Sequence, residues 1–451
     1  MNASGSLLLT RDLSNAAITD RLLGTTRLRH PALTAVTWLC AGLTLMLFAA
    51  IGFTVLAGVG VWGNNIPVAW AMPIINFVWW IGIGHAGTFI SAILLLLEQR
   101  WRNSLNRLSE AMTLFALVQA GLFPLLHLGR PWFFYWLIPY PAEMGTWPQF
   151  MSTLPVDVVA VSTYTIVSIL FFYLGLIPDL ASARDRAKSP RARALYGLAS
   201  LGWRGSARHY KHYRSAQLLL AGLATPLVLS VHSIVSMDFS IAKLPGWHST
   251  IFPPYFVAGA IFSGFAMVAM LLVPLRKLYR LETFITPRHF DLMGKLMLVT
   301  GLIVGYSYVC EVYNAWYSAS DYERHMALFT RPLGPYAVLY WLMLFCNVAA
   351  PQALWFRKVR RSGWALWTVA VLIQVGMWVE RFVLIVTSEH QDYLPSSWDI
   401  YTPSVVDGAI FFGSVGFFML LLIGMMRVIP WVSIAETKEL QHELRLGASD
   451  G

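Results

Sequence analysis

The sequence predicts an all-α membrane protein with ten transmembrane helices. Of its 451 residues, 57% are hydrophobic and 12% are charged, and the mean hydropathy is +0.58, which is more apolar than a soluble domain. Ten apolar stretches can each cross a hydrocarbon core of about 30 Å at about 1.5 Å per residue. They cover residues 33–62, 67–98, 108–128, 156–180, 214–236, 253–275, 290–316, 332–356, 362–386 and 404–429. Because ten is even, both ends of the chain are expected on one side.

Lysine and arginine predict which side that is. The terminal segments and the loops on their side hold 27 of these residues, nine of them between Arg184 and Arg214. The opposite loops hold only four, namely Arg130, Lys243, Arg324 and Arg331. The positive-inside rule therefore places both termini in the cytoplasm. We interpret the net charge of +10 as a topology signal and expect no nucleic-acid partner, although loop 184–214 could also attract anionic lipids of the bilayer or an acidic partner.

The segments outside the spans are too short for a soluble domain, since none exceeds about 35 residues. Residues 1–32 are polar and lack the pattern of a cleaved signal peptide, so we expect a cytoplasmic N-terminal segment and a cytoplasmic tail at 430–451. The three cysteines, Cys40, Cys310 and Cys346, are isolated in apolar segments. The chain is therefore not expected to bind an iron–sulfur cluster.

Ionisable side chains gather near span ends on the side away from the basic loops. His127 closes the third span, Asp157 opens the fourth, and His232 and Asp238 end the fifth. Taken singly, Asp157 is typical of a helix N-terminus and His127 of the membrane interface. Together they belong to consecutive spans joined by one outer loop, so they can approach each other. An imidazole and a carboxylate are suited to accept two protons from a bound hydroxyaromatic.

Other ionisable groups lie deeper in the spans. Glu380 and Arg381 are adjacent in the ninth span, where they can neutralise each other or bind a polar partner. His85, among small residues of the second span, is interpreted as a packing histidine. We expect His85 toward the inner side and His127 and His232 toward the outer side. Such a separation leaves no facing pair of histidines for haem.

The outer loops are rich in proline, tryptophan and tyrosine. They cover residues 129–155, 237–252, 317–331 and 387–403. Aromatic residues at this depth suit the interfacial belt of a membrane protein. The same surface would also suit the docking of another protein.

Three motifs resemble the NrfD/PsrC family of membrane subunits. They are NFVWWIGIGHAGT at 76–88, GWHSTIFPPYFVAGA at 246–260 and WVERF at 378–382. The similarity covers about residues 33–429, and within the family it is greatest to the ActC type found in alternative complex III, a quinol:electron-acceptor oxidoreductase. The resemblance implies two four-helix bundles, residues 67–252 and 253–403, flanked by the first span (33–66) and the tenth (404–429).

The resemblance also implies a quinol site near the outer face, formed by His127, Asp157, Asp238 and Arg381. His127 and Asp157 would accept the protons of menaquinol or ubiquinol, and no haem or iron–sulfur cluster would be bound by this chain. The implied partners are a periplasmic iron–sulfur or molybdopterin-like subunit, c-type cytochrome subunits and a second NrfD-like membrane subunit. The implied location is the inner membrane of a bacterium.

Two further questions stay open at this stage. Titratable groups spread through the membrane depth indicate a possible proton path, for which the candidates are His85, Lys295, Glu311, Glu380 and Asp407, together with Glu98 and Glu110. The alternative functions are a secondary transporter or proton channel, and a membrane anchor of the sister ActF type. Transporters often place their polar groups at the midplane, whereas the cluster here lies near one face.

Overall fold

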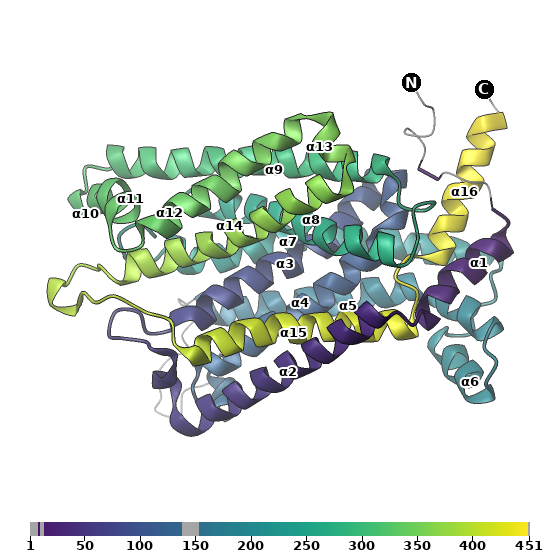
Figure 1. The fold of residues 1–451 in the computed structure, drawn as a ribbon, viewed down its shortest axis with the longest axis horizontal. Helices are drawn as coiled ribbons and strands as arrows, with labels where there is room; N and C mark the ends of the chain where they lie inside the picture. The colour runs from purple at the N-terminus through teal and green to yellow at the C-terminus, as the bar shows by residue number, and fades with distance from the viewer. Residues whose placement is uncertain (1–7, 10–12, 138–152, 450–451) are drawn as a thin grey trace.

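The computed structural model describes residues 8–9, 13–137 and 153–449, and every regular element in this part of the chain is helical (Figure 1). Ten segments are long and apolar enough to span a membrane. Nine are single helices: α2 (Pro31–Ala57), α3 (Ala71–Leu96), α4 (Asn106–His127), α5 (Thr153–Asp185), α7 (Ala207–Ser240), α8 (Phe252–Leu278), α9 (Pro287–Tyr317), α14 (Gly363–Glu389) and α15 (Val405–Val428). The tenth is composite and covers Ala337–Trp355. The predicted all-α class with ten spans is confirmed.

Hydropathy located the spans but underestimated several of their lengths. The fifth span was predicted at 214–236, whereas α7 extends from Ala207 to Ser240. The ninth was predicted to end at 386, whereas α14 continues to Glu389. Polar residues can continue a helix beyond its apolar part, and a hydropathy window does not detect them. These added turns change the depth of the side chains near the helix ends.

Helices α3, α8 and α14 form the buried centre of the molecule. They are the most buried of the spans, and α3 contacts both α8 and α14. Gly264 of α8 lies directly against Ala86 of α3, so a side chain at Gly264 would clash with Ala86. Small residues allow such close approach of two helices. Polar groups at this centre are therefore shielded from lipid by the surrounding spans.

The other spans pack around this centre in two groups. Helix α3 contacts α4 and α7, and α5 also contacts α4 and α7, so these four helices pack together as one group. Helix α8 contacts α9 and α14, while the composite span contacts α9 and α14. Helices α2 and α15 pair along one side of the molecule, where Gly413 and Gly416 of α15 lie against Leu43 and Leu47 of α2.

The composite span is irregular along its length. It consists of α12 (Ala337–Leu344), a π-helical turn η7 (Phe345–Ala349) and a 3₁₀ segment η8 (Ala350–Trp355). Turns of the π type are rare and occur frequently at functional sites. Pro351 lies in the 3₁₀ segment, where its lack of an N–H is compatible with the loss of α-helical hydrogen bonding.

Shorter helices connect the spans or cover their ends. They are α1 (Asn15–Gly24), η2 (Thr25–Arg27), η3 (Val59–Trp62), η4 (Arg100–Ser104), η5 (Pro131–Leu137), α6 (Pro190–Ala199), α10 (Asp321–His325), η6 (Met326–Thr330), α11 (Arg331–Leu333), α13 (Arg357–Arg361), η9 (Pro395–Ser397) and α16 (Ile434–Ser449). Helices α1, α6 and α16 lie at the end of the molecule that carries both termini (Figure 1). We call this end the terminal end and the opposite one the distal end.

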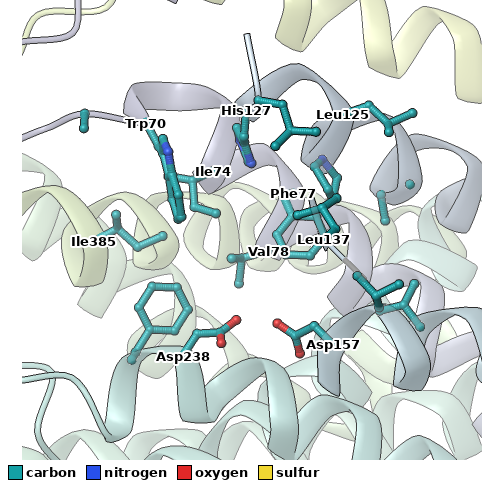
Figure 2. Close-up of a pocket in the computed structure, with 18 of the residues that line it drawn as sticks. Trp70, Ile74, Phe77, Val78, Leu125, His127, Leu137, Asp157, Asp238 and Ile385 are labelled. Atoms are coloured by element: carbon teal, nitrogen blue, oxygen red, sulfur yellow. The ribbon is translucent and has the colours of Figure 1, made fainter. Parts of the chain in front are cut away.

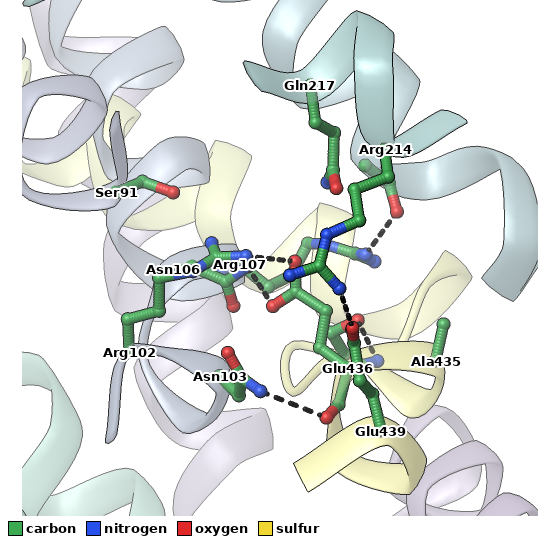
Figure 3. A network of polar contacts seen from close by, with 12 residues as sticks. Ser91, Arg102, Asn103, Asn106, Arg107, Arg214, Gln217, Ala435, Glu436 and Glu439 are labelled. Atoms are coloured by element: carbon green, nitrogen blue, oxygen red, sulfur yellow. Dashed lines mark hydrogen bonds and ion pairs between the residues drawn. The ribbon is translucent and has the colours of Figure 1, made fainter. Parts of the chain in front are cut away.

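The C-terminal helix α16 is anchored to the terminal end by buried charges (Figure 3). The Arg102 guanidinium pairs with Glu436 at 3.1 Å, and Asn106 donates a hydrogen bond to the same carboxylate. Asp179 of α5 accepts hydrogen bonds from the backbone N–H groups of Ile434 and Ala435, both at 2.9 Å. The predicted tail is thus a docked helix, because its first turn satisfies charges on α5 and near the start of α4.

Candidate functional site

A cavity of about 780 Å³ lies at the distal end of the molecule. It is lined by α3, α4, α5 and α7 and by the last turns of α14, and most of its lining is apolar. Side chains from these separate helices converge on it (Figure 2). Its size is typical of sites that bind organic molecules. The other described wall residues come from the segment just before α3, from residues 128–137 and from the loop between α7 and α8.

His127, the last residue of α4, is held between aromatic rings. Its imidazole stacks on Trp70, with ring centroids 5.5 Å apart and planes inclined by 10°. Trp62 and Phe77 contact it edge-on, at 6.3 and 6.4 Å between centroids. The Nε2 atom is buried and has no hydrogen-bond partner. The ring is therefore fixed in position, while one nitrogen stays available to a molecule in the cavity.

Two carboxylates, Asp157 and Asp238, point toward each other across the cavity (Figure 2). Asp157 lies near the start of α5 and Asp238 near the end of α7. One oxygen of each, Oδ1, is buried without a hydrogen-bond partner. No lysine or arginine is among the described residues that line the cavity. Because carboxylates without a cationic partner are costly in an apolar setting, this arrangement favours a guest that donates protons or hydrogen bonds.

The cavity is also lined by residues that the sequence did not single out as candidates for the site. Glu389, at the end of α14, lines it with a buried and unpartnered Oε2 atom. Trp247 also lines it, and its indole N–H donates to the Leu384 carbonyl at 2.8 Å. Glu389 had been counted in an outer loop because the apolar stretch ends at 386. Its spacing of four residues from Ile385 is the signal that could have placed both on one helix face.

Arg381, predicted as part of the site, does not line this cavity. It lies on the same face of α14 as Ile385 and Glu389, but about 12 Å deeper than Glu389 at about 1.5 Å per residue. Its guanidinium pairs with Glu380 at 2.9 Å and lies over the Phe256 ring, 4.1 Å from the centroid. The assignment of Arg381 to a quinol site therefore stays a prediction, and its side chain lies below the floor of this cavity.

The expected separation of His85 from His232 is wrong. Their Nδ1 atoms lie 3.0 Å apart, and both side chains are almost fully buried. His85 is near the middle of α3, and the longer α7 places His232 about two turns before its distal end. His232 therefore lies below the cavity rather than beside His127. The interpretation of His85 as a simple packing histidine is also incomplete, because both Nε2 atoms lack a partner.

A second buried polar group surrounds Glu380. The Tyr308 hydroxyl donates to Glu380, and the Asn347 amide donates to Tyr308 at 2.8 Å and to Glu380 at 3.2 Å. Asn347 lies on the π turn of the composite span. Nearer the distal end, Glu311 pairs with Arg331 at 2.6 Å. These contacts place the predicted Glu311 and Glu380 within the second group of helices.

The remaining candidates for a proton path are scattered. Glu110 accepts a hydrogen bond from Ser91 at 2.5 Å in the buried interior. Lys295 is half exposed beside Asp291, 3.8 Å away. Asp407 caps α15 and accepts from the Ser404 N–H and the Tyr401 hydroxyl. Glu98 is an exposed residue at the terminal end. The structure therefore does not connect Lys295, Asp407 or Glu98 to the central groups.

Part of the aromatic outer surface lies outside the described residues. Loop 129–155 is described only as far as Leu137 and again from Thr153, so Pro139-Tyr140-Pro141 is not included. In the described part, Trp132 and Phe134 are exposed. Among the described residues, no group of three or more histidine, cysteine, aspartate or glutamate side chains is arranged to hold a metal ion.

Fold and cavity together define a polytopic helical membrane protein with a largely apolar cavity at its distal end. A family model described as "Polysulphide reductase, NrfD" matches residues 60–391. This is more than half of the chain, and the chain therefore belongs to the NrfD family. The predicted family is confirmed, whereas its narrower placement in the ActC type stays a prediction.

Two relatives extend this comparison. A putative membrane subunit of dimethyl sulfoxide reductase from Halobacterium salinarum is 24% identical over 386 residues, which is 80% of this chain and 83% of that protein. The Hdr-like menaquinol oxidoreductase integral membrane subunit of Archaeoglobus fulgidus is 25% identical over 256 residues, which is 51% of this chain and 62% of that protein. Both names describe membrane subunits of oxidoreductases.

Proposed function

We propose that this chain is the quinol-binding membrane subunit of an oxidoreductase complex of the ActC type, and that quinol is oxidised in the distal cavity. One observation carries the proposal: three unpartnered, buried proton-accepting atoms, on His127, Asp157 and Asp238, face an otherwise apolar cavity. Apolar walls suit the ring and tail of a quinol, and the polar atoms suit its two hydroxyl groups. Menaquinol, which appears in the name of one relative, is the first substrate to test, with ubiquinol as the alternative.

The residues of the cavity would divide the chemistry between them. Quinol supplies two protons and two electrons when it is oxidised. His127 would accept one proton at Nε2, and the facing carboxylates of Asp157 and Asp238 would accept the other. The aromatic cage of His127 fixes the ring for this transfer. Electrons would leave to an iron–sulfur centre of a partner subunit and on to c-type cytochrome subunits.

The proposal includes an orientation in the membrane. The distal end, with few lysine and arginine residues, would face the periplasm of a bacterial inner membrane, and both termini would lie in the cytoplasm. Quinol oxidation would then release its protons outside. The periplasmic iron–sulfur or molybdopterin-like subunit would dock on the aromatic distal loops, beside a second NrfD-like membrane subunit. In this arrangement the electron acceptor and the cavity lie on the same side of the membrane.

Substitution of the cavity acids in the purified complex tests the proposal. Asp157→Asn and His127→Ala should each lower the rate of quinol oxidation by about 10²–10⁴-fold, while the complex still assembles. Asp321→Asn is the matched control, because it removes a carboxylate of the distal end whose side chain is 97% exposed. Normal turnover in both cavity variants would contradict the proposal. Purification without any redox partner would instead favour a transporter or channel.

A proton route across the membrane is a second proposal, which a polar stripe on α3 favours. Ser91, Thr88 and His85 follow one another at intervals of three residues. Ser91 donates to Glu110, Thr88 donates to Ser168 at 3.2 Å, and His85 faces His232. Ionisable groups inside a membrane often mark ion pathways.

Proton counting in sealed vesicles tests this route. Quinol oxidation alone would release two protons per quinol outside, so additional outward release with uptake from inside would support a pump. Release of only two protons, without uptake from inside, would contradict it.

A further inference from the structure

Glu389 is the cavity acid that the proposed function has not used. It is the last residue of α14 and so comes from the second group of helices, whereas His127, Asp157 and Asp238 come from α4, α5 and α7. Its Oε2 atom is buried and accepts no hydrogen bond from a described residue. The cavity is therefore closed on one side by an acid without a partner.

The position of Glu389 places it between the cavity and the distal surface. Ile385 and Glu389 are four residues apart on α14 and both line the cavity, so they share a face of the helix. Ile385 lies on the Asp238 side of the cavity (Figure 2). Glu389 lies one turn farther toward the distal end, and its side chain is partly exposed. This carboxyl group therefore borders the cavity and lies on the last turn of α14, at the distal end of the helix.

Helix stability does not explain an acid at this position. The C-terminal end of a helix carries partial negative charge, which disfavours a carboxylate there. A buried carboxylate oxygen without a donor is a second unfavourable feature. Arg381 lies one turn below Ile385 on the same face of α14. Its guanidinium is paired with Glu380 and does not neutralise the charge of Glu389. Both the helix dipole and the missing hydrogen-bond donor disfavour a carboxylate here, and no contact of Glu389 with a described residue offsets them. We therefore expect its role to lie in the cavity.

We infer that Glu389 is the proton outlet of the cavity: it takes protons from the Asp157–Asp238 pair, on the Asp238 side, and releases them to the water at the distal end. The inference rests on the proposed function. Each quinol loses two protons and two electrons, and the electrons pass to the iron–sulfur centre of the partner subunit. In the outlet step, one carboxyl O–H bond breaks as another forms, so no further reactant is required.

The test compares Glu389→Gln with the Asp321→Asn control in the intact complex. Glutamine keeps the size of the side chain but cannot carry the proton. We expect quinol oxidation to slow by about 10²-fold or more while the KM for quinol is unchanged. A small diffusible acid such as acetate should restore part of the rate in Glu389→Gln and none in Asp157→Asn. A purely structural role of Glu389 would not give this rescue.

The outcomes separate the outlet from the proposed function. A normal rate in Glu389→Gln with an inactive Asp157→Asn would overturn the outlet and leave the quinol site intact. Normal rates in both Glu389→Gln and Asp157→Asn would overturn the outlet and the proposed quinol site together. If Glu389→Gln fails to assemble, Glu389→Asp decides the question, because it keeps the carboxyl group. Failure of both variants to assemble, or a slow Glu389→Gln that acetate does not restore, would show a structural role and overturn the outlet.

Discussion

The Nδ1 atoms of His85 and His232 lie 3.0 Å apart between α3 and α7, inside the buried centre of the protein. At this distance one Nδ1 donates a hydrogen and the other accepts it, so the two neutral rings are opposite tautomers. The donor ring then has a bare Nε2 and the acceptor ring an Nε2–H. Both Nε2 atoms lack a partner among the described residues. The pair is therefore asymmetric although its two members are the same residue type.

The histidine pair predicts non-additive effects on stability. His85→Leu or His232→Leu leaves the other Nδ1 atom buried without a partner, which should lower the free energy of unfolding by about 1–3 kcal/mol. The double variant removes both polar groups and should cost less than the sum of the single variants. Thermal unfolding in detergent of the four proteins measures this. Additive losses would contradict a direct hydrogen bond between the rings.

The stacking of Trp70 on His127 predicts a role in binding. Trp70→Ala removes the ring parallel to the imidazole, and an aromatic pair contributes about 0.5–1.5 kcal/mol. We expect the Kd for a quinone analogue to rise by about 2–10-fold. Trp355→Ala, which removes an exposed tryptophan near the terminal end, is the control. An unchanged Kd in Trp70→Ala would show that His127 is held sufficiently by Trp62 and Phe77.

Gly376 of α14 packs closely against the π turn of the composite span, and this contact predicts a steric effect of a larger side chain. A Cβ atom at Gly376 would clash with the Asn347 side chain and with Cys346. Gly376→Ala should therefore lower the free energy of unfolding by about 1–3 kcal/mol and displace the amide that binds Glu380. Gly424→Ala is the matched control, because Gly424 is also in a helix but has no atom within 4 Å of the added Cβ. Equal thermal stability of the two variants would contradict this prediction.

Two hydrogen bonds at Gly246, in the loop after α7, predict that the stability of the protein depends on pH. The Gly246 N–H donates to Glu323 at 2.9 Å, and the Gly246 carbonyl accepts from Arg331 at 3.1 Å. Burial raises the pKa of the Glu323 carboxyl above 4.5, although the Gly246 N–H and Arg331 act in the opposite direction. The folded state thus binds this proton more tightly than the unfolded chain. Its contribution to stability is complete below pH 4.5 and is lost as the pH rises through the folded pKa.

Glu323→Gln removes this titration but keeps an oxygen that can accept from Gly246. The stability of the wild type relative to Glu323→Gln should therefore decrease as the pH is raised from below 4.5 to neutrality. Thermal unfolding of both proteins across that range gives the difference. A difference that is constant, or that grows with pH, would contradict the raised pKa.

Hydropathy predicted the spans because stretches of about 20 consecutive apolar residues are rare outside membranes. The proximity of His127, Asp157 and Asp238 could be predicted because all three lie near span ends on one side of the membrane and come from consecutive spans. Arg381 and His232 could not be placed correctly, since their positions depend on helix length to within one turn. Glu389 was missed because three polar residues continue α14 beyond its apolar part, so a hydropathy window assigns it to a loop. The pairing of His85 with His232 depends on helix contacts that no local pattern records.

Helix α16 is synthesised last but binds residues that are synthesised early, and this has a consequence for the assembly of the protein. Asp179 and Arg102 bind a helix that the ribosome synthesises only after the tenth span, so Arg102 lacks its partner Glu436 until then, whereas Asp179 can already pair with Arg107 of α4. If one of spans three to ten failed to insert, α16 would lie on the opposite side of the bilayer from Arg102 and could not bind it. Attachment of the last helix therefore reports correct insertion of the earlier ones. An unattached α16 would be an exposed, protease-sensitive mark of a misassembled molecule.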